Sequence, residues 1–354
     1  MSGRLGSRTT TEALAGRLRL PVMAGPMFIA STAELAIAQC RVGIVGALPA
    51  LNPRSPILLR TALGQITEAL AGDNQAAPFA INIVAHRTND RLDEDLAAVI
   101  DFQVPIVIVS LAAPSDIVGA VHAYGGLVFN DVISDRQARK CAEAGIDGLI
   151  AVAAGAGGHT GKVSPFALVQ EIRRWWDGPL ALSGCIATGR NVLAAQVMGA
   201  DFAYIGSPFL ASDEANTAPG LKAMIVASEA ADVMVTDCFT GIPATFLRPS
   251  IIANGLDPSA LIRDKSGAID IKDGGANPKA WRDIWSAGQG IAAITRAEPA
   301  AVYVARLADE YQAARRGLSR LAATTPGKKL GRRARRRPSS GKDPQGRLQP
   351  PDRQ

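Results

Sequence analysis

The chain has 354 residues, of which 47% are hydrophobic and 20% charged, with a formal net charge of +6. This composition is typical of a folded globular protein and excludes a wholly disordered chain. No apolar run approaches the roughly 18 residues of a membrane span, and the N-terminus lacks the apolar stretch of a signal peptide, so we expect no membrane attachment. The four cysteines form no C-x-x-C pair, so we expect a reduced cytoplasmic protein without a disulfide framework or zinc site.

Short β-branched runs alternate with helical stretches through the first two thirds of the chain. The predicted strands are Leu20–Ala24, Val42–Leu48, Phe79–Val84, Ile106–Val109, Leu127–Asn130, Gly148–Val152, Leu180–Ser183 and Phe202–Ile205. The predicted helices between them include Ile57–Ala71, Arg91–Ile100, Asp135–Ala144, Pro165–Trp176 and Arg190–Met198. Continuous apolar strands that are each followed by a helix indicate parallel βα units. Eight such units favour a (β/α)8 barrel over a doubly wound sheet, and we assign it residues 15–228.

The regular alternation stops after about Ser228. We expect residues 229–290 to form a smaller, mostly helical lid domain and residues 291–316 to close the barrel with a helix. The range 317–354 is predicted to be a disordered basic tail, because it is rich in Arg, Pro, Gly and Ser and has few apolar residues to bury. Residues 315–354 hold 13 of the 38 Lys and Arg but two of the 32 Asp and Glu, so the rest of the chain has a net charge of −5.

The stretch AVAAGAGGHTGK, residues 151–162, resembles a phosphate loop at first sight. A P-loop would need glycine where Ala156 stands and a hydroxyl residue at Val163, and the spacing of dinucleotide-binding glycines would need glycine at Thr160. Both nucleotide readings therefore fail. What remains is a glycine loop after a predicted strand that presents one imidazole, His159.

Two further loops follow the seventh and eighth predicted strands, with the sequences SGCIATGR and IGSPF. Small residues just before a helix start can bind a phosphate through backbone amides and the helix dipole, and in barrels this role typically falls to these two loops. Plain turn chemistry would also explain Gly184 and Gly206, since glycine permits a positive φ. Two such loops at adjacent strand ends favour phosphate binding.

The segments PVMAGPM, AGAGGHTG, PLALSGCIATGRNVLAAQVMGAD, YIGSPFLAS and IWSAGQG together resemble the nitronate monooxygenase family, also called 2-nitropropane dioxygenases. The resemblance covers roughly residues 15–315. It implies a TIM barrel with non-covalently bound FMN that oxidises alkyl nitronates, and sometimes nitroalkanes, with O₂ to a carbonyl compound and nitrite.

Carried over by position, the resemblance implies a catalytic His159, as base or substrate orienter. It also implies that a set of loop and strand-end residues binds FMN. These are Met23, Ala24, Gly25, Asn82, Gly157, Gly158, Ser183, Gly184, Cys185, Gly206 and Ser207. Relatives often have a second glycine where this chain has Cys185, but a backbone amide serves there whatever the side chain.

An imidazole with a pKa near the operating pH suits removal of the α-proton of a nitroalkane, whereas a nitronate arrives deprotonated and needs only orientation. His86 and His122 are interpreted as structural. Trp281 and Trp285 either cap the substrate pocket or pack the lid on the barrel, and the sequence does not decide between these roles.

Other functions are weighed against this interpretation. An NAD(P)H-dependent FMN reductase on the same scaffold, acting on quinones or enoyl thioesters, stays open, because nicotinamide often stacks on FMN without a fingerprint of its own. A non-catalytic binding protein would not need His159 and its glycines. No G-x-S-x-G hydrolase elbow appears. The basic tail raises the possibility of nucleic-acid binding, but the barrel supplies no basic face or aromatic interleaving to support it. The oligomeric state is left open.

Overall fold

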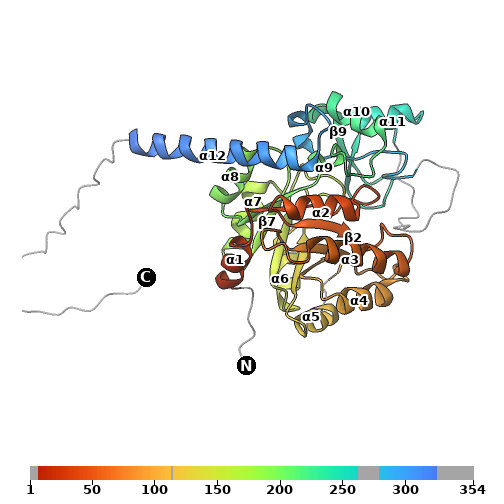
Figure 1. Ribbon diagram of the computed structural model, residues 1–354. Coiled ribbons are helices and arrows are strands. Elements are labelled where there is room, and N and C mark those ends of the chain that lie inside the picture. Colours follow the sequence, from red (N-terminus) through yellow and green to blue (C-terminus); the bar gives the residue numbers. More distant parts are fainter. Residues whose placement is uncertain (1–6, 113–114, 262–278, 325–354) are drawn as a thin grey trace, which may run out of the picture. The chain divides into compact units, whose positions relative to one another are not determined.

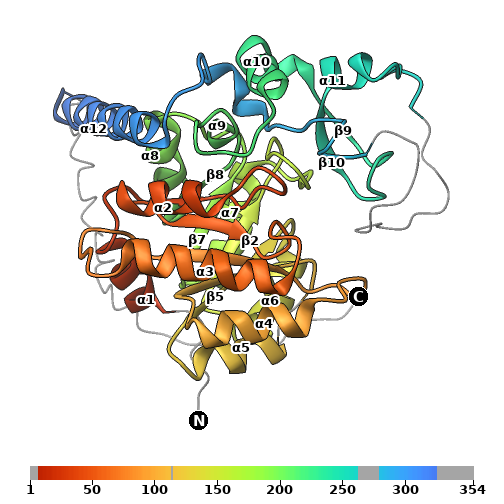
Figure 2. The ribbon, with the colours of Figure 1, turned by 45° about the vertical axis from the view of Figure 1, so that its right-hand side comes forward.

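The computed structural model describes residues 7–112, 115–261 and 279–324. Eight parallel strands form one sheet in the order β1-β8-β7-β6-β5-β4-β3-β2. The sheet closes on itself beside β2, because the amide of Ala24 donates to the carbonyl of Val45 at 2.8 Å and the amide of Val45 donates to the carbonyl of Val22 at 3.1 Å. The fold is therefore a TIM barrel with its helices outside the strands (Figures 1 and 2), as the sequence predicts.

The barrel strands are short and almost fully buried, which is the signature of strands covered on both faces. They are β1 (Val22–Ala24), β2 (Gly46–Pro49), β3 (Phe79–Val84), β4 (Ile106–Ser110), β5 (Leu127–Val132), β6 (Gly148–Val152), β7 (Leu180–Ser183) and β8 (Phe202–Ile205). Four of them have the predicted bounds. The predicted first two strands begin four residues or fewer too early, and β4 and β5 run one and two residues further than predicted.

Helices follow the strands in the expected alternation. The barrel helices are α1 (Arg8–Ala15), α2 (Ala33–Arg41), α3 (Pro56–Leu70), α4 (Leu92–Asp101), α5 (Ser115–His122), α6 (Asp135–Glu143), α7 (Pro165–Arg173) and α8 (Gly189–Met198). Hydroxyl side chains of Thr32, Ser55, Ser134 and Thr188 accept a hydrogen bond from a first-turn amide. Such caps satisfy amides that a helix leaves open, so they fix where each helix begins.

The register of the strands places one set of side chains on a common face of the sheet. Asn82 lies on the same face as Ser110, and Ser110 on the same face as Asp131. The alignment continues through Ser183 and Tyr204, which are direct partners. Burial raises the pKa of Tyr204, and the charge of Asp131 adds to this although two strands separate β5 from β8, so this face is the inside of the barrel.

The chain after the barrel is more mixed than the mostly helical lid that the sequence predicts. It contains α9 (Ser207–Leu210), α10 (Pro219–Ala227), the 3₁₀ helix η1 (Ala230–Asp232), the antiparallel hairpin β9 (Val233–Thr236) and β10 (Ala244–Leu247), α11 (Arg248–Ala253), the 3₁₀ helix η2 (Gln289–Ala293) and α12 (Ala300–Thr324). Figure 2 shows α9, α10, α11 and the hairpin together in the upper part of the view. The lid residues that are described belong to the same compact unit as the barrel, which extends to Arg316.

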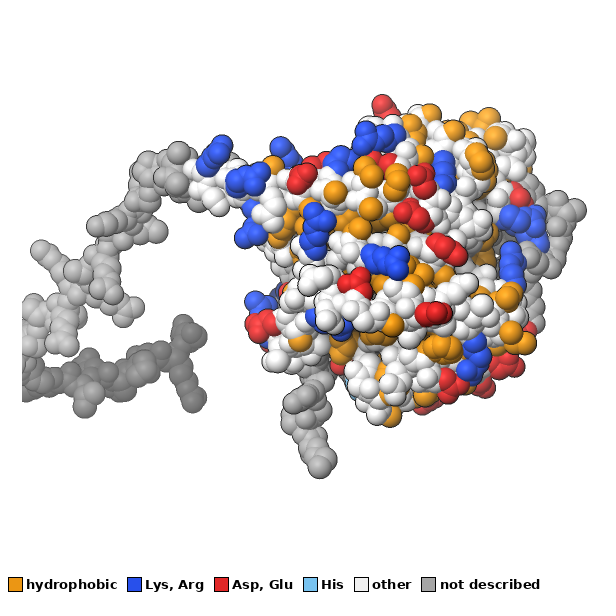
Figure 3. Space-filling view, in the orientation of Figure 1, with side chains coloured by type: hydrophobic (Ala, Val, Ile, Leu, Met, Phe, Trp, Pro, Cys, Tyr) orange, Lys and Arg blue, Asp and Glu red, His pale blue; other side chains and the backbone are white. Residues whose placement is uncertain are grey.

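The last helix differs from its prediction. Helix α12 continues to Thr324, eight residues into the range assigned to the disordered tail, and residues 325–354 lie outside the described residues. Within residues 7–112, 115–261 and 279–324, no helix combines the length and apolar character needed to span a membrane. Acidic and basic side chains are interspersed over the helices in view in Figure 3.

Candidate active site

The glycine loop after β6 is held between the barrel and the lid. The amide of Gly158 donates to the Ser286 hydroxyl at 3.0 Å, and the carbonyl of Gly158 accepts from the amide of Thr245 at 2.9 Å. The next residues continue this pairing, because His159 forms an isolated antiparallel bridge with Ala244. The loop is therefore an extra strand-like segment along β10, and the histidine has a defined position.

His159 lies in a largely apolar environment. Its ring packs edge-on against Trp281, with ring centroids 5.0 Å apart and planes at 85°. Burial lowers the pKa of His159 to about 4. Its buried Nε2 atom has no hydrogen-bond partner among the described residues. The imidazole is thus neutral at neutral pH, and one ring nitrogen remains available to a ligand.

Trp281 itself has a backbone conformation that L-residues rarely adopt, with φ of 64°. Its ring also contacts Phe246 and Phe28, each at a centroid distance of 6.3 Å. Trp285 instead joins the lid cluster around Ile291, and its Nε1 donates to the carbonyl of Arg282 at 3.1 Å. Of the two tryptophans that the sequence left undecided, Trp281 therefore covers the histidine and Trp285 packs the lid.

The glycine loop after β6 crosses a second glycine segment, which contains Gly288. The amide of Gln289 donates to the carbonyl of Gly155 at 2.9 Å, and the amide of Gly288 donates to the Ser207 hydroxyl at 2.7 Å. A Cβ atom on Gly157 would lie 2.9 Å from the Gly288 nitrogen, which is too close for any side chain. Sequence reasoning did not assign Gly288 a role, although the IWSAGQG motif that contains it was part of the family resemblance.

The ends of β1 and β8 come together at a glycine-lined opening. The amide of Gly25 donates to the carbonyl of Ile205 at 2.7 Å, and a Cβ atom on Gly25 would lie 3.4 Å from the Cα atom of Gly206. A Cβ atom on Gly206 would meet only the Met27 side chain, at 3.8 Å and 3.9 Å. The structure therefore brings the predicted residues of these two strand ends into contact and leaves space beside Gly206. The side chains of Tyr204 and Met27 stand beside these two glycines.

The loop after β7 turns through two left-handed residues, Gly184 with φ of 135° and Cys185 with φ of 57°. Glycine adopts this conformation without cost, so the glycine found in relatives matches the backbone here. Burial raises the pKa of the Cys185 thiol, which disfavours the reactive thiolate. The amide of Cys185 itself donates to the carbonyl of Gly155 at 3.4 Å.

One part of the phosphate prediction is wrong at helix α8. Its first amide, at Gly189, donates to a carboxylate oxygen of Glu310 at 2.8 Å. A Cβ atom on Gly189 would lie 2.1 Å from the backbone nitrogen of Tyr311, so α12 covers this helix start closely. The helix dipole is therefore used within the protein, and the amides of Ala187 and Thr188 just before α8 donate to the Asn191 side chain at 3.3 Å and 3.2 Å.

A line of polar side chains crosses three strands inside the barrel. The Asn82 amide donates to the Ser110 hydroxyl at 2.8 Å and to the carbonyl of Ile108 at 3.1 Å, and Ser110 donates to a carboxylate oxygen of Asp131 at 2.6 Å. Asn82 is buried, as a residue that faces a cofactor from the barrel interior would be. Asp131 escaped sequence reasoning, although a carboxylate at the end of the apolar strand LVFNDV was a visible signal.

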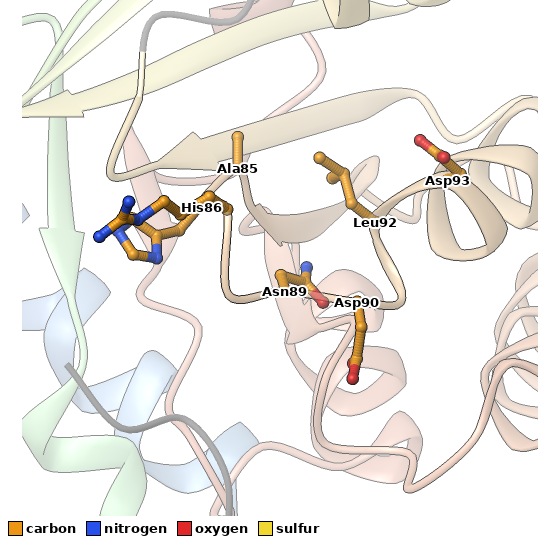
Figure 4. Close-up of a pocket in the computed structure, with 7 residues that line it drawn as sticks. Ala85, His86, Asn89, Asp90, Leu92 and Asp93 are labelled. Atoms are coloured by element: carbon orange, nitrogen blue, oxygen red, sulfur yellow. The ribbon is translucent and has the colours of Figure 1, made fainter. Parts of the chain in front are cut away.

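The other two histidines each form a hydrogen bond away from His159. His86 Nδ1 contacts the Thr88 hydroxyl at 2.8 Å, and His122 Nε2 contacts a carboxylate oxygen of Asp147 at 2.8 Å. His86 is among the residues that line a cavity of about 390 Å³, formed by the loop between β3 and α4 together with the first turn of α4. Figure 4 shows these side chains. The structural interpretation of both residues agrees with these contacts.

Comparison with known proteins adds a family model described as "Nitronate monooxygenase", which matches residues 57–310. A "Probable nitronate monooxygenase" of Staphylococcus aureus is 30% identical over 154 residues, or 40% of this chain and 43% of the relative. The chain spans about half the length of the curated relatives it matches.

Solved structures resemble nearly the whole described chain. The M276A mutant of FabK from Thermotoga maritima is 26% identical, with a TM-score of 0.72, over 88% of this chain and 98% of the other. Nitroalkane oxidase from Streptomyces ansochromogenes is 24% identical, with a TM-score of 0.71, over 86% of this chain and 99% of the other. At this identity the second likeness shows the fold.

Proposed function

The chain belongs to the nitronate monooxygenase family, and from this premise we propose that it oxidises alkyl nitronates with O₂ to a carbonyl compound and nitrite, using bound FMN. The observation that carries the proposal is His159, whose unpartnered Nε2 lies buried beneath Trp281 in the loop that the family motif covers. The residues around it fit a flavin enzyme, because the site offers glycine-lined space next to a single neutral base.

FMN would lie at the ends of β1, β7 and β8. Met23, Ala24 and Gly25 would contact the ring through backbone atoms, and Asn82 would face its polar edge from the barrel interior. The phosphate group would be held by Ser183, Gly184, Cys185, Gly206 and Ser207. Bound there, the flavin supplies the electron-transfer chemistry, and the protein supplies orientation, water exclusion and a proton acceptor.

The environment of His159 favours a nitronate over a neutral nitroalkane. A nitroalkane α-C–H is a far weaker acid than an imidazolium whose pKa is about 4, so removal of that proton by His159 is strongly uphill. A nitronate has already lost the proton. Its negative charge also raises the pKa of a neighbouring imidazole. His159 can therefore donate a hydrogen bond to a nitronate oxygen, and no proton has to be taken from the substrate.

Trp281 and Phe246 contribute by covering this base. The Trp281 ring packs on the imidazole and Phe246 packs on Trp281, and an electrostatic interaction between His159 and an anionic substrate is stronger in such an environment than in water. We expect the substrate to enter on the side of the exposed Phe28, which is 43% accessible and touches Trp281 edge-on.

Steady-state assays of the purified holoprotein test the proposal. On addition of propionate 3-nitronate, wild type should consume O₂ and release nitrite, and His159→Asn should do so more slowly while retaining its flavin. NADH added instead should give no comparable O₂ consumption. Activity with NADH and a quinone or enoyl thioester, without activity on nitronate, would refute the proposal and assign the NAD(P)H-dependent reductase.

A further inference from the structure

Asp131 is a half-buried carboxyl group that the reaction described above does not use. It stands at the end of β5, on the inner face of the barrel, and accepts a hydrogen bond from a neighbouring side chain. The Ser110 hydroxyl donates to it at 2.6 Å, and Ser110 is itself fixed by Asn82 at 2.8 Å. The three side chains form a continuous line from β3 to β5 across the floor of the proposed cofactor site.

A residue near this carboxyl group has an unfavourable backbone conformation. Leu111, directly after β4, has φ of 72°, a conformation that residues with a side chain disfavour. The Ser110 hydroxyl and the Leu111 backbone lower the pKa of Asp131 against the larger effect of burial, which raises it. An unfavourable backbone conformation of this kind persists where the surrounding structure requires it, and here it lies beside the carboxyl group.

Asp131 belongs to no ion pair among residues 7–112, 115–261 and 279–324. The titratable groups that sense its charge are Tyr204 on β8 and Cys141 on α6, and burial together with that charge raises both of their pKa values. Lys140, exposed on α6, acts on Cys141. The carboxylate therefore depends on hydrogen bonds alone.

We propose that Asp131 is a positioning residue that takes up a proton when FMN binds, and that its protonated form donates a hydrogen bond to the cofactor. This inference rests on the proposed function. An uncharged ring placed over the mouth of the barrel displaces water from the carboxyl group, and desolvation without a balancing cation favours the neutral acid. A protonated carboxyl group gains an O–H donor, which carbonyl oxygens of a flavin can accept.

Burial already raises the pKa of Asp131 to about 6 in the protein without ligand. At about pH 7.5 the group is mostly ionised, so a further rise on binding means that the complex holds a proton that the free protein lacks. The affinity for FMN should then weaken as pH rises through about 6, by up to about tenfold per pH unit, until the pKa of the complex is passed. Below about pH 6 the affinity should become independent of this group.

Titration calorimetry with FMN, in buffers of different ionisation enthalpy at about pH 7.5, counts the protons taken up. Wild type should take up most of one proton more than Asp131→Asn, which cannot be charged. The difference between the two proteins cancels protonation of the FMN phosphate itself. Asp101→Asn, at an exposed ion pair with Arg60, is the matched control and should behave as wild type.

Ser110→Ala gives an independent measurement if Asp131→Asn does not fold. It removes the 2.6 Å donor that favours the charged carboxylate, so proton uptake should begin at a higher pH than in wild type. Equal proton uptake by wild type and Asp131→Asn, or an unchanged onset in Ser110→Ala, would overturn this inference while leaving FMN binding intact. A wild-type protein that binds no FMN would instead refute the proposed function, and this inference with it.

Discussion

Replacement of His159 by Asn should make the protein less sensitive to acid. The structure places the imidazole beneath Trp281, where burial lowers its pKa from 6.5 to about 4. The folded state therefore stays neutral at this position over a pH range in which the unfolded chain takes up a proton. Stability from this group is fully present above about pH 6.5 and is lost as pH falls toward about 4.

The size of the effect follows from the two pKa values. Between about pH 7.5 and pH 5, the unfolded imidazole becomes almost fully charged and the folded one stays almost fully neutral. The free energy of unfolding should then fall by at most about 2 kcal/mol more in wild type than in His159→Asn. Contributions from other carboxyl groups and histidines are shared by both proteins and cancel in the comparison.

Urea unfolding of both proteins at the two pH values measures this difference directly. Trp281→Ala is the matched control, because it keeps the imidazole but admits water to it. Between the two pH values, its free energy of unfolding should fall by less, relative to His159→Asn, than that of wild type does. Unfolding free energies of wild type and His159→Asn that change in parallel with pH would show that the imidazole is not held neutral by burial, and would refute the reasoning.

Three further changes test the site. Gly206→Asp should give a colourless protein, because a carboxylate would face the phosphate. Gly206→Ala should keep its flavin, since the added Cβ would meet only the Met27 side chain. Visible absorbance of the purified variants measures this, and a fully flavinated Gly206→Asp would show that the phosphate binds elsewhere. Cys185→Gly should keep its flavin and raise the unfolding free energy by up to about 1 kcal/mol, because it removes a left-handed non-glycine residue, and a loss of stability in urea titration would contradict this. His159→Asn should lower kcat/KM for a nitronate, because the hydrogen bond to the anionic substrate is lost. A loss of about 10²–10⁴ on a neutral nitroalkane, with little loss on a nitronate, would instead assign His159 the role of a general base.

The barrel strands were predictable because their signal is local. Each is a short, continuous apolar run, and a strand buried on both faces needs little else; β3, β6, β7 and β8 accordingly have their predicted bounds. The position of His159 in a glycine loop after β6 could also be read from the chain, since the loop follows directly from the strand.

Contacts made by distant segments could not be read in this way. The pairing of His159 with Ala244 depends on the β9–β10 hairpin, which the sequence analysis assigned to a mostly helical lid. The occupation of the α8 N-terminus by Glu310 joins residues 121 positions apart. The ionisation of Asp131 depends on which face of β5 points inward, and one residue of register would reverse that face.

The most direct measurement of the central claim is anaerobic mixing of the yellow holoprotein with propionate 3-nitronate, 2-nitropropane and NADH in turn, with flavin absorbance as the readout. The account predicts that nitronate bleaches the flavin fastest, that 2-nitropropane does so more slowly because His159 is a weak base, and that NADH leaves the flavin oxidised. Bleaching by NADH with none by nitronate would contradict it.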